Sequence, residues 1–154
     1  EVWIPERYAE IIGRVYASGN LPRQPCLSVA ARRESPSRLE LELNPRRGLL
    51  RISVVEAGGD LGLRVQEIVQ QSTAEIAQVD FPMDDPAIGN SVEAVREAGF
   101  WFCAVLPEWR QGDWLRVQRA VATHKAFSRP NLANDTAKQI LAFIESDGAL
   151  ISPL

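Results

Sequence analysis

The chain has 154 residues, 45% of them hydrophobic and 24% charged, a formal net charge of -3 and a pI near 5.3. These values are typical of one globular domain and exclude a disordered chain or a collagen-like repeat. The acidic balance argues against a dedicated nucleic-acid binder, which needs a basic face. No apolar run reaches the roughly 20 residues that span a bilayer. We therefore expect neither a nucleic-acid nor a membrane partner.

The two cysteines, Cys26 and Cys103, each lie in a short apolar run. Two thiols do not make a disulfide framework, and free cysteine is usually a small buried hydrophobe. Together with the lack of a visible signal peptide, this predicts a cytoplasmic protein. The chain begins with Glu1 rather than methionine, so a processed start, a cleaved tag or a preceding partner domain all stay open.

The first predicted elements are a helix and a short strand. Pro5 suits the first turn of a helix, whose apolar spacing runs through Tyr16 and ends at Gly19. Residues 26–31 (CLSVAA) form a short apolar run, which we interpret as a strand.

Strict alternation marks the clearest β-structure of the chain. Residues 38–43 (RLELEL) place three leucines on one face and Glu40 and Glu42 on the other. Residues 44–48 (NPRRG) have turn composition, and residues 49–55 (LLRISVV) alternate again. The pattern predicts a hairpin with one buried face.

In the second half of the chain, strands alternate with helices. Asp60 is suited to cap a helix whose apolar stripe runs to Ile76, and the Asp85-Pro86 step is suited to begin another, which Gly99 ends. The continuous apolar run at 100–106 is typical of a central strand covered on both faces. Further strands are predicted at 78–81 and 113–119.

The predicted order of elements indicates an α/β fold with a mixed central sheet and flanking helices. Residues 1–119 form the body of this domain. Residues 120–154 form a C-terminal extension with one helix, at about 135–146, that Gly148 ends.

One segment carries a family resemblance. Residues 95–100 (VREAGF), a long apolar strand and then residues 112–115 (GDWL) resemble the C-terminal half of the GNAT acyltransferase superfamily. The hairpin, the glycine-rich break and the following helix are similar to strand 4 and the acyl-CoA-binding helix of that superfamily. The resemblance covers residues 5–119, and a full GNAT domain would have a first strand and helix before them. It implies acetyl-CoA or another acyl-CoA as cofactor, and a small-molecule or protein amine as acceptor.

The resemblance also implies a cofactor site. The backbone of Val54 and Val55 would bind the pantetheine arm, and the loop made of Gly58, Gly59, Asp60, Leu61 and Gly62 would bind the pyrophosphate. Backbone N–H groups and the helix dipole favour an anion at such a loop, and glycine permits its close approach. The family's basic or amide first residue is missing, and Glu56 and Asp60 put carboxylates where phosphates would lie. Ordinary turn formation therefore stays an alternative.

The catalytic residues depart from the family pattern as well. Many members carry a tyrosine acid four residues before the glycine of the "GF" step, and here Val95 stands in that position. Glu40, Glu42 and Glu56 are candidate bases, because burial can raise a carboxyl pKa towards neutrality. The alternation of the strand assigns Glu40 and Glu42 to a solvated face, so Glu56 is the preferred candidate.

Other candidate sites are weaker. Trp109 and Trp114 could line an apolar ligand pocket or belong to the core. Asp80, Asp84 and Asp85 could take a cation or serve as turn and cap residues. His124 is the sole histidine, so we predict no metal site, and a nucleophilic pair of Cys103 with His124 would need an unusually reactive thiol.

Two functions compete. The first is an N-acyltransferase in which an amine attacks the thioester directly, aided by proximity and by backbone stabilisation of the oxyanion. The second is a non-catalytic GNAT-like ligand-binding or regulatory domain of a larger protein. A splay between strand 4 and strand 5 is needed to admit a pantetheine arm.

Overall fold

The computed structural model describes residues 1–120 and 132–151. Its elements follow the chain in this order: β1 (Val2–Ile4), η1 (Glu6–Tyr8), α1 (Ala9–Ser18), β2 (Pro25–Leu27), β3 (Arg38–Asn44), η2 (Pro45–Arg47), β4 (Leu49–Glu56), α2 (Leu61–Gln71), β5 (Ile76–Pro82), α3 (Ile88–Glu97), β6 (Trp101–Leu106), β7 (Trp114–Ala120) and α4 (Asp135–Ala149).

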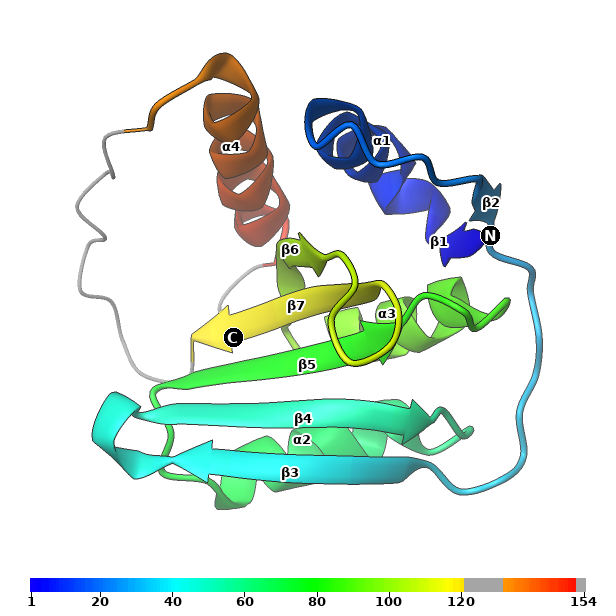
Figure 1. The fold of residues 1–154 in the computed structure, drawn as a ribbon. Helices are drawn as coiled ribbons and strands as arrows, with labels where there is room; N and C mark the ends of the chain where they lie inside the picture. Colours follow the sequence, from blue (N-terminus) through cyan, green and yellow to red (C-terminus); the bar gives the residue numbers. More distant parts are fainter. Residues whose placement is uncertain (121–131, 152–154) are drawn as a thin grey trace.

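A mixed five-stranded sheet in the order β3-β4-β5-β7-β6 forms the centre of the molecule (Figure 1). β4 and β5 are parallel, as expected for strands joined by the crossover helix α2, and the other neighbours are antiparallel. β1 and β2 form a separate, parallel two-stranded sheet. The α/β class and the mixed sheet with flanking helices are therefore confirmed.

The sheet has two different faces. Figure 1 shows α2 and α3 behind the sheet, and α1 and α4 beyond its β6 edge. The face towards α2 and α3 is apolar, because the buried residues of paired strands share it: Leu50, Ile52, Val54, Ala77, Val79, Phe81, Leu115 and Val117. The opposite face carries polar residues at the alternate positions of β3, β4, β5 and β7, and we call it the open face.

The predicted hairpin is confirmed. β3 and β4 pair from Leu39↔Val54 to Asn44↔Leu49, which puts the leucines of β3 on the apolar face and its glutamates on the open face. Gly48 adopts a left-handed φ of 59° in the connection, which its lack of a Cβ permits.

Several predicted boundaries were wrong. The strand expected at 26–31 is limited to Pro25–Leu27. α2 ends at Gln71, so Ile76 belongs to β5 instead of the helix. Asp85 is not an N-cap, since α3 begins at Ile88 with Ala87 at the N-cap, and Asp85 Oδ1 accepts a hydrogen bond from the Ala87 N–H in a local turn.

The apolar run at 100–106 was also misplaced, because β6 is an edge strand and β7 lies between it and β5. β6 is apolar because α4 packs beside it. Phe102, on β6, is fully buried in edge-to-face contact with Phe143 of α4 and Tyr8 of η1, at centroid distances of 5.3 and 5.2 Å. A helix can thus bury an edge strand that would otherwise need a further strand.

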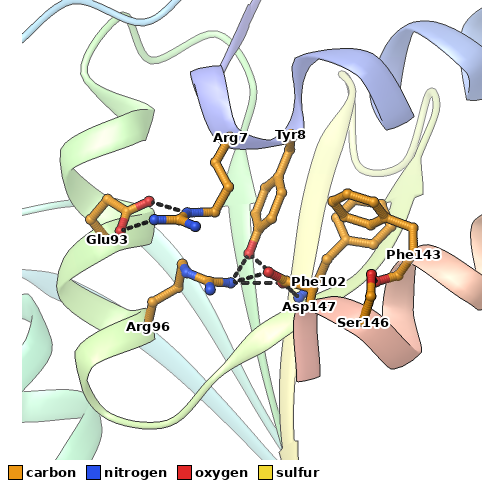
Figure 2. Close-up of polar contacts among 8 residues, drawn as sticks. All are labelled: Arg7, Tyr8, Glu93, Arg96, Phe102, Phe143, Ser146 and Asp147. Carbon is orange, nitrogen blue, oxygen red and sulfur yellow. Dashed lines mark hydrogen bonds and ion pairs between the residues drawn. The ribbon is translucent and has the colours of Figure 1, made fainter. Parts of the chain in front are cut away.

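One buried carboxylate fastens α4 to this body (Figure 2). Asp147 accepts hydrogen bonds from Tyr8 Oη at 2.9 Å, from Arg96 Nη1 at 2.7 and 2.8 Å, and from the Phe102 N–H at 2.7 Å. Burial raises the pKa of Tyr8, and the neighbouring carboxylate adds to the shift. Because Gly148 lies inside α4 and the helix ends at Ala149, the predicted stop at Gly148 was wrong.

We predict that Asp147→Asn lowers the free energy of unfolding by about 3 kcal/mol or more, because it leaves the buried Arg96 guanidinium without a counter-charge. Urea unfolding followed by circular dichroism measures the change. Lys138→Gln removes an exposed ion pair of the same helix and is expected to change stability by less than about 1 kcal/mol. Equal effects of the two substitutions would contradict the assignment.

Candidate functional site

The glycine loop between β4 and α2 is occupied by the chain itself. Residues 33–37 cross it so closely that a Cβ on Gly58 would lie 2.1 Å from the Ser35 carbonyl oxygen, and one on Gly59 would lie 2.4 Å from that of Arg33. Real Cβ atoms do not make such contacts, so these positions need glycine for the approach of their own backbone. The close approach that glycine permits is thus made by an internal segment.

Hydrogen bonds hold this segment in place. The Gly58 N–H donates to Ser37 Oγ at 2.9 Å, and the Gly59 N–H donates to the Ser35 carbonyl at 3.1 Å. Ser37 in turn donates from its N–H and its hydroxyl to Asp60 Oδ1, at 2.7 Å each. Two of the N–H groups that an anion would use are therefore already satisfied.

Asp60 has a different role from the predicted helix cap. It stands at the N-cap position of α2, but its carboxylate makes no capping bond to the helix. The hydrogen bonds from Ser37 lower the pKa of Asp60 and keep it ionised. A fixed negative charge at this end of α2 opposes a phosphate group.

An open cavity of about 600 Å³ lies beside the loop, between residues 30–34 and the first turns of α3. One of its arginines is engaged, since Arg33 binds the Ala57 carbonyl and the carboxylate of Asp85. Asn90, on α3, accepts a hydrogen bond from the Ala31 N–H at 3.1 Å. Both interactions fasten the 30–37 segment across the mouth of the loop.

β4 and β5 part at their carboxyl ends. Their pairing runs from Leu49↔Ile76 to Ser53↔Asp80, and β4 then continues without β5 through Val54 and Val55. The divergence is visible in Figure 1. The Val54 side chain is buried in the core, and β5 pairs with neither Val54 nor Val55.

The two candidate catalytic positions, Glu56 and Val95, lie in different surroundings. Glu56 ends β4 with 66% of its side chain exposed and forms an ion pair with Arg38 at 2.6 Å. Val95 is fully buried in α3 and has no proton to donate. The assignment of Glu56 as a base stays a prediction.

The open face of the sheet carries an aromatic and arginine cluster. Trp109, in the β6–β7 loop, has the guanidinium carbons of Arg110, Arg116 and Arg51 at 4.4, 5.3 and 5.9 Å from its ring centroid. It meets the ring of Trp114 edge-to-face at 5.7 Å. Trp109 and Trp114 are therefore neighbours, and Trp109 lies over the guanidinium groups of three arginines; their role in a ligand pocket stays a prediction.

Beneath Trp109 lies a buried ion pair. Asp80 is fully buried and accepts two hydrogen bonds from Arg116, at 2.6 and 2.9 Å. Arg110 donates to Ser53 Oγ at 3.0 Å. These partners were not predicted from the sequence, although the alternation of polar residues along β4, β5 and β7 could have placed them on one face.

The loop that carries Trp109 is under backbone strain. Glu108, Arg110 and Gln111 all have positive φ, between 50° and 68°, a region that non-glycine residues rarely enter. Asp113 fixes the loop by accepting hydrogen bonds from the Glu108 N–H, Arg23 and Tyr16. Burial alone would raise the pKa of Asp113, but these donors lower it.

The remaining candidates separate in space or fall outside the described residues. Asp80 binds Arg116 and Asp85 binds Arg33, so the acidic cluster does not assemble. Within residues 1–120 and 132–151, no group of three histidine, cysteine or acidic side chains could hold a metal ion. His124 lies outside those residues, and burial raises the pKa of the Cys103 thiol to about 11.

Comparisons with known proteins return no match to a family model, to a curated protein or to a solved structure. No helix in the described part of the chain is both long and apolar enough to cross a membrane.

We predict that Ser37→Ala lowers the free energy of unfolding at pH 7 by about 1–3 kcal/mol, because it leaves the Gly58 N–H without its acceptor and removes one of the two hydrogen bonds that Asp60 accepts from Ser37. The folded pKa of Asp60 is lowered, so this stability is present above the ordinary value of about 3.9 and is lost as the pH falls through the folded value. Urea unfolding at pH 7 and near pH 3 should therefore show a smaller loss in acid. Ser18→Ala, at an exposed helix end, is the control, and an equal loss at both pH values would contradict the role of Asp60.

We also predict that Cys103 is unreactive in the folded protein. A thiol with a pKa of about 11 at pH 8 has a thiolate fraction roughly 100-fold below that of an ordinary cysteine. In Cys26→Ser, a disulfide reagent should modify Cys103 slowly in native buffer and rapidly in urea. Fast modification of the native variant would restore Cys103 as a candidate nucleophile.

Proposed function

We propose that this chain is a GNAT-like domain that binds a partner and does not transfer acyl groups. The observation that carries the proposal is the closed glycine loop. The Gly58 and Gly59 N–H groups are bonded to the chain's own Ser37 and Ser35, and the Asp60 carboxylate is held beside them. A cofactor pyrophosphate would have to displace this segment and overcome the repulsion of Asp60.

The positions expected to carry catalysis also support a binding role. Val95 replaces a proton donor inside the core, and Glu56 is in solvent beside Arg38. Asp80 and Asp113 are buried but are fully engaged by arginine and other donors. Neither Asp80 nor Asp113 is free to accept a proton from an amine.

An acyl-CoA-dependent N-acyltransferase is the second candidate, and one observation favours it. β4 and β5 stop pairing after Ser53 and Asp80, which leaves the backbone of Val54 and Val55 without a partner on the β5 side. This is the splay that a pantetheine arm would need.

Titration of the full chain with acetyl-CoA by isothermal calorimetry decides between the two. The proposal predicts no saturable heat up to about 1 mM ligand, where the binding free energy would be about -4 kcal/mol, and no release of free thiol with an amine present. A functional acyltransferase run in the same buffer validates the assay, and circular dichroism verifies the fold. Saturable binding would overturn the proposal in favour of the second candidate.

A loop variant must be chosen with care in this experiment. Gly59→Glu would block an anion site, but its Cβ would also meet the Arg33 carbonyl at 2.4 Å and disrupt the fold. Arg32→Ala is the better probe. Arg32 is exposed at the cavity and has no hydrogen bond or ion pair to the described residues, so its loss would weaken any acyl-CoA binding without unfolding the protein.

A further inference from the structure

The outer edge of β3 is open. β3 is an edge strand of the sheet (Figure 1), and among the residues that the structure describes, none pairs with its outer side. Its ladder with β4 is regular from Leu39 to Asn44, with the one irregularity at Arg38/Leu39. Such a strand presents a row of unpaired backbone N–H and C=O groups that can accept another strand.

The side chains along this edge protect it only in part. Proteins usually block an exposed edge with charged side chains, lysine above all, or with proline or a bulge. Residues 39–44 (LELELN) contain no lysine, proline or bulge, and their charges are the glutamates Glu40 and Glu42. Leu41 and Leu43 are 55% and 53% exposed although they point to the apolar face. The two exposed leucines lie beside free backbone groups, and together they make this edge a surface that an added strand could cover.

The two faces of the edge differ in charge. On the open face, the side chains of Glu40 and Glu42 are 71% and 58% exposed. Arg110 of the β6–β7 loop and Arg51 of β4 approach them, at 3.9 and 3.2 Å, and leave most of both carboxylates open. The edge therefore offers leucine on one side and negative charge on the other.

This pattern disfavours a second copy of the chain as the occupant. In an antiparallel pair of two β3 strands, the leucines of both copies must lie on the same face of the joined sheet. Odd-numbered residues (the leucines) must then lie opposite odd-numbered residues, and even-numbered residues (the glutamates) opposite even-numbered ones. Every such register centred on the strand puts a glutamate opposite a glutamate: Glu40 with Glu40, Glu40 with Glu42, or Glu42 with Glu42. Like charges directly opposite each other destabilise a pair of strands.

We infer that the outer edge of β3 binds an extended protein segment in which apolar and basic residues alternate. The backbone of the segment would continue the sheet, its apolar side chains would contact Leu41 and Leu43, and its lysines or arginines would face Glu40 and Glu42. The inference rests on the proposed binding function and gives that function the chemical class of its partner.

The test uses the full chain and a capped seven-residue peptide that alternates valine and lysine. In a titration followed by two-dimensional NMR, the amide signals of residues 39–44 should shift saturably. A peptide with glutamate in place of lysine should bind at least about tenfold more weakly, because it repeats the charge of the edge. No saturable shift with the lysine peptide overturns the inference.

Charge reversal on the protein gives the matched test. Glu40→Lys with Glu42→Lys should weaken the lysine peptide about tenfold or more and strengthen the glutamate peptide. The control, Glu67→Lys with Glu97→Lys, makes the same change of net charge on the exposed surfaces of α2 and α3 and should leave both affinities within about twofold. An equal response to both double substitutions overturns the inference, since binding would then depend on net charge.

The apolar and backbone contacts are tested separately. Leu41→Thr should weaken binding, whereas Leu150→Thr, which alters a leucine 72% exposed at the end of α4, should not. N-methylation of one set of alternate peptide amides should abolish binding, and methylation of the other set should leave it intact, because only alternate amides of an added strand face β3. Binding that survives both methylations overturns strand addition.

Sedimentation of the free protein tests whether a second copy of the chain occupies the β3 edge. A monomer across the NMR concentration range supports the inference, and a dimer that protects the amides of residues 39–44 from exchange overturns it. The outcome is distinguishable from that of the acetyl-CoA titration, which reports on the loop at Gly58 and Gly59. If the chain binds both acetyl-CoA and the lysine peptide, the non-catalytic assignment is refuted and the β3 edge is still supported as a binding surface.

Discussion

The backbone contact between residues 33–37 and the glycine loop joins the two parts of this fold. The segment leads from the N-terminal β1–β2 unit to the hairpin, and it crosses the start of α2 where Gly58 and Gly59 lack side chains. Ser37 satisfies an N–H of the loop and a carboxylate of the helix with one hydroxyl. Because this contact uses the groups that an anion would need, the same interaction that stabilises the fold also closes the expected cofactor loop.

Buried carboxylates stabilise the other junctions of the molecule. Asp147 joins α4 to η1, α3 and β6, and Asp113 joins the β6–β7 loop to α1 and the segment after it. Asp80 joins β5 to β7. A charge in the interior is tolerated only when paired and hydrogen-bonded, so each of these acids is held by arginine. Each of these three acids therefore fixes the position of a helix, a strand or a loop.

The distribution of polar residues over the sheet gives the binding surfaces. Helices cover the apolar face, whereas the open face presents Trp109 above its arginines and, beside them, the glutamates of β3. The exposed leucines of β3 lie at the border of the two faces, on an edge without a neighbouring strand. A partner that adds a strand would extend both faces at once, and this places the proposed recognition on the side of the sheet opposite to β6 and α4.

The sequence by itself determined the local elements. The alternation of residues 38–43 predicted β3 and its faces, and helical spacing predicted α1 and α3, because these periodicities follow from the geometry of neighbouring residues. It also indicated that Val95 removes the expected acid and that the glycine loop lacks a basic residue. The neighbourhood of Trp109 and Trp114 was found as well, since they flank one short loop.

Only the tertiary structure decided the strand order, the edge position of β6 and the closure of the glycine loop. Each depends on contacts between residues far apart in the chain, such as Ser37 with Asp60, Asp80 with Arg116 and Tyr8 with Asp147. Local patterns specify which face of an element is apolar but not what will cover it. An apolar strand that a helix buries has the same sequence pattern as one buried between two strands. A glycine that permits the close approach of its own backbone looks the same in the sequence as one that permits the approach of a ligand.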